Sequence, residues 1–495
     1  MTDKFDEKLN SLVDDMPPAP ETVNSVNPWK NTMRKMVWGI CLTLGTFNFP
    51  VIGVILSSLA VILIILGARS LKTENSAFKT CYVVSLIKLV KYVLGLALEA
   101  CCLNITEFAD KALYPMALFG ALLDLILLIN FRRGVLDVKR KAGYEAGGGG
   151  FLALIIWYIV LLAIALLGGA GLIGWILFIS YIFIVISIVK FTKGIEGAGY
   201  ELTPAELKYP DSYVFTACAV LMLTVIFIGN LCFSRLPMQW EAASETPAYD
   251  EEIAESLKSL GFPESILKDL SSEDIAQCEG ADMVRVSSYI HDNNYNSYRY
   301  YLDSEYKTAE NGTCTVAHIA VRIPTEINGT EWYRWYVINY FIWPGENNFK
   351  GNELMWLTTL YNRGTFDVVT YPFEGRVLYD DGETTYVSAF NSIGKKYVQT
   401  NGIFSSGGTN ALDIAMWSFP GRVSNARGYI AYIAENIKSL EINENAIINY
   451  YHQKNAINFP LTTPVKGGDV YNWKNTSAYI LFNDLFLLNT EGKVY

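Results

Sequence analysis

Histidine is scarce in this chain: the 495 residues include only His291, His318 and His452. The sequence also contains neither a nucleophile elbow nor a helical pair of zinc ligands. A glycosidase would need two carboxylates at a defined distance, which a sequence alone does not give. We therefore expect no enzyme activity, no metal site and no cofactor, and an extracellular enzyme is the weakest function class.

Positive charge is scarce in the second half of the chain. Residues 1–233 carry 19 Lys and Arg against 17 Asp and Glu, whereas residues 234–495 carry 20 against 32. Proteins bind phosphate backbones mainly by exchanging counterions for Lys and Arg side chains. The acidic second half therefore excludes nucleic acid as an expected partner.

The N-terminus lacks the features of a removable signal peptide. Residues 1–28 include Asp14, Asp15 and Pro17 but have no basic start, short apolar stretch or small-residue cleavage site. Their composition predicts a disordered tail. We expect this tail to remain cytoplasmic, so that the first membrane helix directs insertion.

Long apolar runs are the strongest positive feature. They span residues 36–66, 80–103, 112–131, 151–189 and 212–233. A helix needs roughly 20 apolar residues to cross a bilayer. Residues 29–234 are therefore predicted to form a multi-pass helical domain in the cell membrane.

Basic residues set the predicted orientation, because Lys and Arg are enriched in cytoplasmic loops. The loop 132–150 is basic and is placed inside, which leaves residues 235–495 outside. The run 151–189 is long enough for two crossings that turn near Gly168 and Gly169. The run 36–66 has basic residues on both sides and is interpreted as a hairpin of two short helices turning at 48–50. A single long, tilted helix is the alternative. With the hairpin, about seven membrane segments are predicted.

Ionisable residues within the apolar runs need partners, because unpaired charge is unfavourable in a bilayer. From the rise per residue, Lys88 lies about 12 Å and Lys91 about 16 Å from the inner end of its helix, and Asp124 about 10 Å from the inner end of the next helix. These depths predict a pair between Lys88 and Asp124. The pair either locks two helices together or belongs to a proton or substrate path.

The exterior part begins with a small helical module, residues 235–283. Asp250 and the acids after it indicate a helix start, Gly261 a helix end, and Ser271 with Asp274 a second capped start. From residue 284 the apolar period changes to two, which is typical of strands, and Asp381-Gly382 predicts a hairpin.

A recurring pattern suggests how the strands divide. Ile319–Pro324 and the strand after it resemble Ile414–Pro420 and the strand after that. This similarity favours two tandem β-sandwiches, residues 284–380 and 381–495, over one large sandwich. The two exterior cysteines, Cys278 and Cys314, either form one disulfide bond or remain free thiols.

Aromatic residues are abundant in the exterior part, and six tryptophans are candidate ligand contacts. Exposed Trp and Tyr rings combine a large apolar area with a polar N–H or O–H group and can stack on sugars. The other interpretation is that alternate rings fill the sandwich interior. The candidates are Trp332, Trp335, Trp343, Trp356, Trp417 and Trp473.

Two function classes are favoured over the enzyme. The leading hypothesis is a membrane-anchored cell-surface protein whose extracellular β-sandwich domains bind a glycan, an envelope polymer or a protein. The alternative is a transporter or envelope-assembly factor in which the helical bundle is active and the exterior domain gates or recruits.

Overall fold

The computed structural model divides the chain into two compact units, each described here by itself. The helical unit comprises Met1–Ala97 and Asp110–Phe227, and the β unit comprises Leu98–Ala109 and Ile228–Tyr495. The described residues are 28–44, 50–105, 107–143, 149–166, 171–193, 205–243, 250–291, 298–302, 306–308, 313–327, 329–359, 373–392, 396–399, 409–437, 444–453, 455–457, 459 and 479–488.

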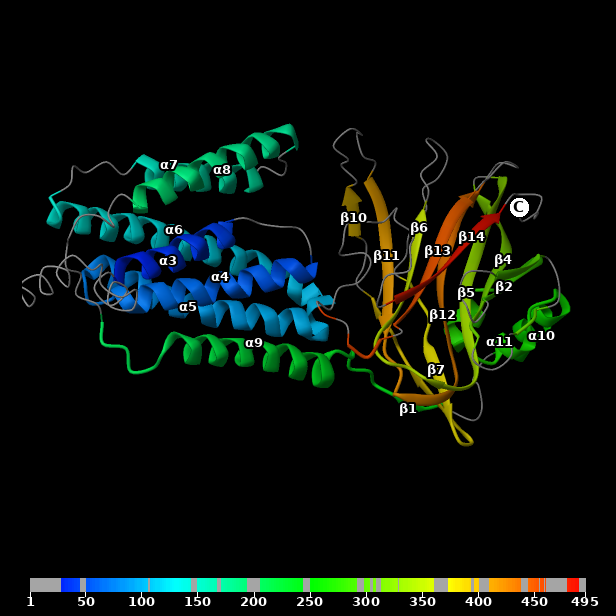
Figure 1. Cartoon of the computed structure of the whole chain (residues 1–495). Helices are drawn as coiled ribbons and strands as arrows, with labels where there is room; N and C mark the ends of the chain where they lie inside the picture. Colours follow the sequence, from blue (N-terminus) through cyan, green and yellow to red (C-terminus); the bar gives the residue numbers. More distant parts are fainter. Residues whose placement is uncertain are drawn as a thin grey trace, which may run out of the picture. The chain divides into compact units, whose positions relative to one another are not determined.

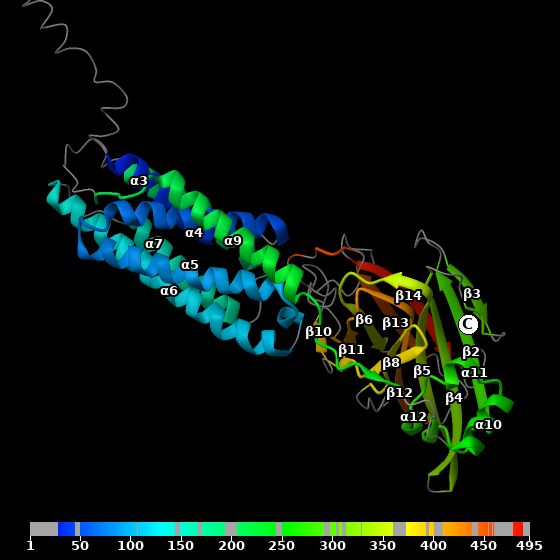
Figure 2. The ribbon, with the colours of Figure 1, turned by 90° about the horizontal axis from the view of Figure 1, so that it is seen from below.

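The apolar runs form helices, which satisfy every backbone hydrogen bond without water. Four helices, α4, α5, α6 and α9, are long and apolar enough to cross a membrane, and α7 and α8 contain shorter apolar stretches. In both views the axes of α5, α6 and α9 are roughly aligned, and the chain runs in opposite directions along α5 and α6 (Figures 1 and 2). The helices are α3 Pro28–Leu44, α4 Pro50–Leu71, α5 Ser76–Ala100, α6 Glu107–Lys141, α7 Gly149–Leu166, α8 Gly171–Lys193 and α9 Asp211–Phe233, with a short 3-10 helix at Cys102–Ile105.

The run 36–66 is divided between two packed helices, α3 and α4, rather than forming one long helix. A Cβ on Gly39 would lie 2.7 Å from the side chain of Ile64, and one on Gly67 would lie 2.5 Å from that of Met36. These contacts are antiparallel, as in a hairpin, and the glycines allow the close approach. The predicted turn at 48–50 falls mostly outside the described residues. The prediction of two short helices is wrong for α4, which has 22 residues because it continues past Leu66.

The helical module forms as its capping residues predict. The side chain of Asp250 accepts a hydrogen bond from the backbone N–H of Glu252, and the Ser271 side chain accepts one from that of Asp274. Gly261 has a φ of 97°, a conformation that favours glycine after a helix. The module helices are α10 Glu251–Ser259, α11 Glu264–Leu267 and α12 Ser272–Ala276.

The strands of the β unit form two antiparallel sheets. The large sheet has the order β1-β8-β7-β12-β5-β4-β2-β3, and the second sheet has the order β10-β11-β6-β13-β14, with β9 paired to β11. The strands are β1 Glu241–Ala242, β2 Met283–His291, β3 Tyr298–Leu302, β4 Thr315–Ile327, β5 Thr330–Asn348, β6 Glu353–Thr359, β7 Val377–Asp381, β8 Thr384–Ser388, β9 Asn391–Ser392, β10 Lys396–Gln399, β11 Thr409–Trp417, β12 Arg422–Ile437, β13 Glu444–Gln453 and β14 Tyr479–Leu488. The predicted hairpin at Asp381-Gly382 joins β7 to β8.

Both faces of the large sheet are covered, because alternate residues of a strand point to opposite faces. On β5, Val337 and Phe341 pack into the core between the two sheets. Ile338 and Tyr340 pack on the other face against the helical module. Figure 1 shows α10 and α11 beside β2, β4 and β5.

The strand pairing does not follow the two predicted tandem sandwiches. β12 pairs with β5 along most of its length, so strands from both sides of residue 380 share the large sheet. The two similar segments also differ in topology, because β4 and β5 form one hairpin whereas β11 and β12 belong to different sheets. Pro324 does not end its strand. Among the described strands, only β5 is paired with β4 at this position, and proline is tolerated where one side of a strand is unpaired.

Candidate functional site

Four of the six candidate tryptophans lie in the interior of the β unit. Trp335, Trp343 and Trp417 belong to the core between the sheets, and Trp356 packs on Tyr451 with ring centroids 4.7 Å apart. Each of the four is at most 3% exposed. The expectation of an exposed aromatic platform is therefore wrong for these rings, because inter-sheet packing uses three of them. Trp473 and the side chain of Trp332 lie outside what the structure describes.

The helical unit brings together the charges predicted to pair. Lys88 on α5 forms an ion pair with Asp124 on α6, and the Tyr158 hydroxyl of α7 lies 3.4 Å from the other carboxylate oxygen. Lys88 is 8% exposed. Lys91 lies one turn further along α5, with its ammonium beside Gly120. Side chains of α5, α6 and α7 thus meet at one polar group within the bundle.

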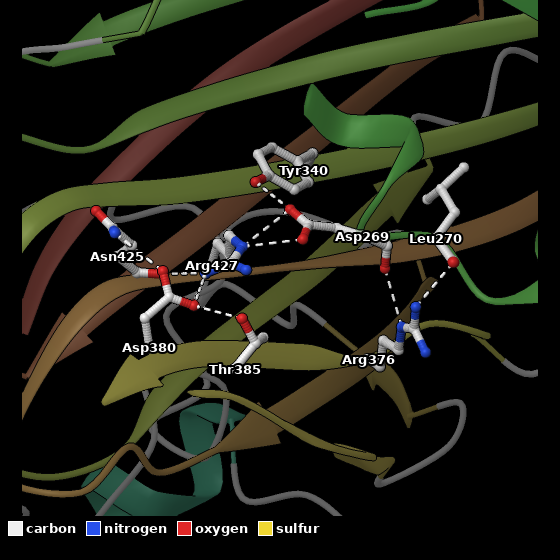
Figure 3. A network of polar contacts seen from close by, with 8 residues as sticks. All are labelled: Asp269, Leu270, Tyr340, Arg376, Asp380, Thr385, Asn425 and Arg427. Atoms are coloured by element: carbon white, nitrogen blue, oxygen red, sulfur yellow. Dashed lines mark hydrogen bonds and ion pairs between the residues drawn. The ribbon is translucent and has the colours of Figure 1, made fainter. Parts of the chain in front are cut away.

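A second buried group joins the helical module to the large sheet, and we call it the Arg427 network (Figure 3). Asp269 follows α11, and both of its carboxylate oxygens accept from Arg427 Nε at 2.9 and 3.0 Å. Arg427 Nη1 also donates to Asp380 on β7 at 2.8 Å. The Tyr340 hydroxyl donates to Asp269 at 2.8 Å. One guanidinium on β12 therefore lies between two carboxylates from different elements.

Neighbouring donors complete the Arg427 network. Asn425 Nδ2 and Thr385 Oγ1 each donate to Asp380 at 2.9 Å. Arg376 donates to the backbone carbonyls of Asp269 and Leu270 at 2.9 and 2.8 Å, which fixes the end of α11 on the sheet. Burial alone would raise the pKa of Asp380, but the bonds from Arg427, Asn425 and Thr385 outweigh it and hold that pKa below its usual range.

The module inserts a second acid, Asp274 on α12, against the same face of the sheet. The hydroxyls of Tyr336 and Tyr429 both donate to its carboxylate, and Tyr429 accepts from the backbone N–H of Ser271 at 3.0 Å. Burial and then the charge of Asp274 raise the pKa of both tyrosines, so they remain donors. Two acids of the module are therefore satisfied by side chains of the sheet.

A third group lies between the two sheets and includes a histidine. Glu353 on β6 is fully buried, and it accepts from Tyr450 at 2.6 Å and from His452 Nδ1 at 3.0 Å. The imidazole packs on the ring of Trp343 with centroids 4.7 Å apart. The Glu353 carboxylate beside Nδ1 therefore holds the imidazole in a fixed orientation. The described residues include no group of three metal-ligating side chains around it.

Cys278 and Cys314, which the sequence predicts to lie outside the cell, are free thiols in the structure. Cys278 packs with the helical module on one face of the large sheet, and Cys314 belongs to the core on the other face. The disulfide alternative does not hold in this structure, because the sheet lies between them. Burial raises the pKa of Cys278 to about 12, with a further contribution from Asp274.

Sequence reasoning did not predict the buried networks of the β unit, although it named Asp274 as part of a helix cap. Arg427 and Glu353 are the useful signals, because each is a charged residue within or beside an apolar strand pattern. Asp269 gave no such signal, since an acid in a short helical module is ordinarily exposed. Its partner Arg427 is 158 residues away in the chain.

Comparison with known proteins adds no identification: no protein-family model, no curated protein and no solved structure matches this chain.

Proposed function

We propose that this is a membrane-anchored protein whose exterior β domain recognises a glycan, an envelope polymer or a protein at the cell surface. Four helices suited to crossing a membrane support the anchor. The main support for a recognition role is the Arg427 network, which fixes the helical module on the large sheet. A surface held rigid before binding loses less conformational entropy when it binds.

The buried tryptophans change the kind of ligand contact that we expect. Trp335, Trp343, Trp356 and Trp417 are at most 3% exposed, so sugar stacking on these rings has no support. The outer side of the module has exposed charges instead, such as Glu255 and Lys268, whose side chains are 70% and 64% exposed. We therefore favour a protein or a charged polymer over a neutral glycan.

Binding by the full-length protein in lipid nanodiscs tests this proposal. Wild type and two matched variants, Arg427→Met and Arg422→Met, are screened for binding. The ligands tested are glycan arrays, envelope-polymer fragments and labelled surface proteins. Arg427 is buried in the network, whereas the Arg422 side chain is 76% exposed. We expect to find a ligand that the Arg422→Met variant binds as tightly as wild type does. The Arg427→Met variant should bind the same ligand more weakly. A ligand bound equally by both variants would show that the module and its network play no part.

The proposal also needs the β domain to lie outside the cell, with the N-terminus and the loop 132–150 inside. Basic residues near the inner helix ends support this orientation. Single cysteines at positions 140 and 330, in a background without native cysteines, test it with an impermeant thiol reagent on intact cells. Labelling at 330 alone is expected, and labelling at 140 alone would reverse the topology.

The second candidate, a transporter or assembly factor, is favoured by the group of Lys88, Asp124 and Tyr158. Ionisable residues inside a bundle often mark substrate or proton paths. Asp124→Asn removes the charge and keeps the shape, and Asp137→Asn is the control because the Asp137 side chain is 44% exposed. If Asp124→Asn protein folds normally and the cells lose an uptake or envelope phenotype, the bundle is the active part.

A further inference from the structure

The inner end of the helical unit contains a cluster of three charged residues, Lys35, Arg69 and Asp211, which we call the Asp211 cluster. Lys35 on α3 and Arg69 at the end of α4 both form ion pairs with Asp211, the first residue of α9. Arg69 also donates to the backbone carbonyl of Tyr209 at 2.9 Å. Two cations therefore share one carboxylate, and the cluster keeps an excess of positive charge.

One donor of this cluster has no hydrogen-bond partner in the part of the chain that the structure describes. The Arg69 side chain is only 9% exposed, and its Nε makes no hydrogen bond to any described residue. A buried guanidinium nitrogen without an acceptor is unfavourable, and such groups are usually satisfied by water or by a ligand. This nitrogen is shielded from solvent in the structure, so an anionic oxygen or a water molecule reaches it only when the Arg69 side chain moves outward.

Exposed aromatic residues lie beside the cluster. The rings of Tyr209 and Tyr213 stack with centroids 6.2 Å apart, and they are 53% and 69% exposed. The ammonium of Lys208 lies 5.6 Å from the centre of the Tyr209 ring. Within the described residues 205–213 the acids are Glu206, which is exposed, and Asp211, which is half-buried, so Lys35, Arg69 and Lys208 outnumber them.

The position of the cluster along the chain indicates where it lies in a bilayer. Asp211 is the first residue of a helix able to cross a membrane, so the cluster is at the end of a span. Tyrosine is enriched at membrane interfaces, and basic residues there attract anionic headgroups. We propose that the Asp211 cluster and the Tyr209–Tyr213 pair bind the phosphate headgroup of an anionic phospholipid.

The test is the thermal stability of the full-length protein in nanodiscs of phosphatidylcholine, with and without phosphatidylglycerol. Helix unfolding is followed by circular dichroism. Phosphatidylglycerol is expected to raise the Tm of wild type by several degrees, because a ligand that binds only the folded state stabilises it. The double variant Lys35→Gln/Lys208→Gln should lose about half of that gain or more.

The control is Lys258→Gln/Lys268→Gln, which removes the same number of lysines from exposed pairs of the helical module. It should keep the full gain. Asp211→Asn removes the competing carboxylate and should enlarge the gain even if it lowers the starting Tm. A full gain in Lys35→Gln/Lys208→Gln, no gain in wild type, or an equal gain from inorganic phosphate in phosphatidylcholine would overturn the proposal.

Discussion

Replacing Arg427 by Met removes the guanidinium between Asp269 and Asp380 while keeping a side chain of similar length. The side chains of Arg427 and Asp269 are 13% and 8% exposed, so the pair is largely shielded from water. Removing one partner of a buried pair leaves the other charge uncompensated, which destabilises by about 3–5 kcal/mol. Asp380 is more exposed, so we expect about 3 kcal/mol, near the lower limit.

The measurement is urea unfolding of the full-length protein in detergent, followed by tryptophan fluorescence. Trp335, Trp343 and Trp417 in the core of the β unit contribute to this signal, as do Trp29 and Trp157 in the helical unit, so the variants are compared under identical conditions. The matched variant Arg422→Met removes an arginine whose ion pair with Glu346 is exposed and screened, so it should change the midpoint little. Equal midpoints for the two variants would refute the argument that burial makes the Arg427 network important.

The pH dependence of the same unfolding reaction gives an independent check. The pKa of Asp380 is below its usual value in the folded protein. Its contribution to stability is therefore present above the unfolded pKa of about 3.9 and is lost as pH falls through the folded value. Wild type should lose this contribution below about pH 4, whereas Arg427→Met has already lost most of it. Parallel pH profiles would contradict this assignment.

Three further substitutions test other parts of the structure. Asp124→Leu should reduce the yield of folded protein by far more than Asp137→Leu, because only the first leaves the buried Lys88 without its partner, at a cost of roughly 3 kcal/mol of stability. Equal yields by size-exclusion chromatography would argue against the pair. Gly375→Ala should lower the free energy of unfolding in urea by more than about 1 kcal/mol, because the residue has a φ of 129° and a Cβ would lie 2.2 Å from the Tyr429 carbonyl oxygen. An unchanged midpoint would show that the loop relaxes. Cys278 should react with maleimide at neutral pH only after unfolding, because its pKa is raised to about 12; fast labelling of folded protein would show that it is accessible.

Sequence reasoning succeeded where the determining interactions are local. Asp250 and Ser271 cap helices within four residues of themselves, and Asp381-Gly382 turns a hairpin between neighbouring strands. The approach of Lys88 to Asp124 follows from helix rise and from the short connection between two antiparallel helices. Each of these features depends on geometry that a few dozen residues determine.

The arrangement of the sheets could not be predicted in the same way. The similarity between the segments at Ile319 and Ile414 describes strand patterns, but it does not say which sheet each strand joins. The aromatic residues were ambiguous for a related reason: alternation places Trp335 and Trp343 on one face, but it does not tell which face is covered. Here the second sheet covers that face and the helical module covers the other.

Charged residues in strand patterns offer a way to recover part of this information. Arg427 lies within β12 and Glu353 begins β6, and a charge at a buried strand position needs an opposite charge or several hydrogen bonds. The need for a carboxylate beside Arg427 could therefore have been predicted before the structure. Its identity could not, because many acids are available and Asp269 comes from a different element 158 residues away. Pairing of that range depends on the packing of the module on the sheet, which only the assembled fold determines.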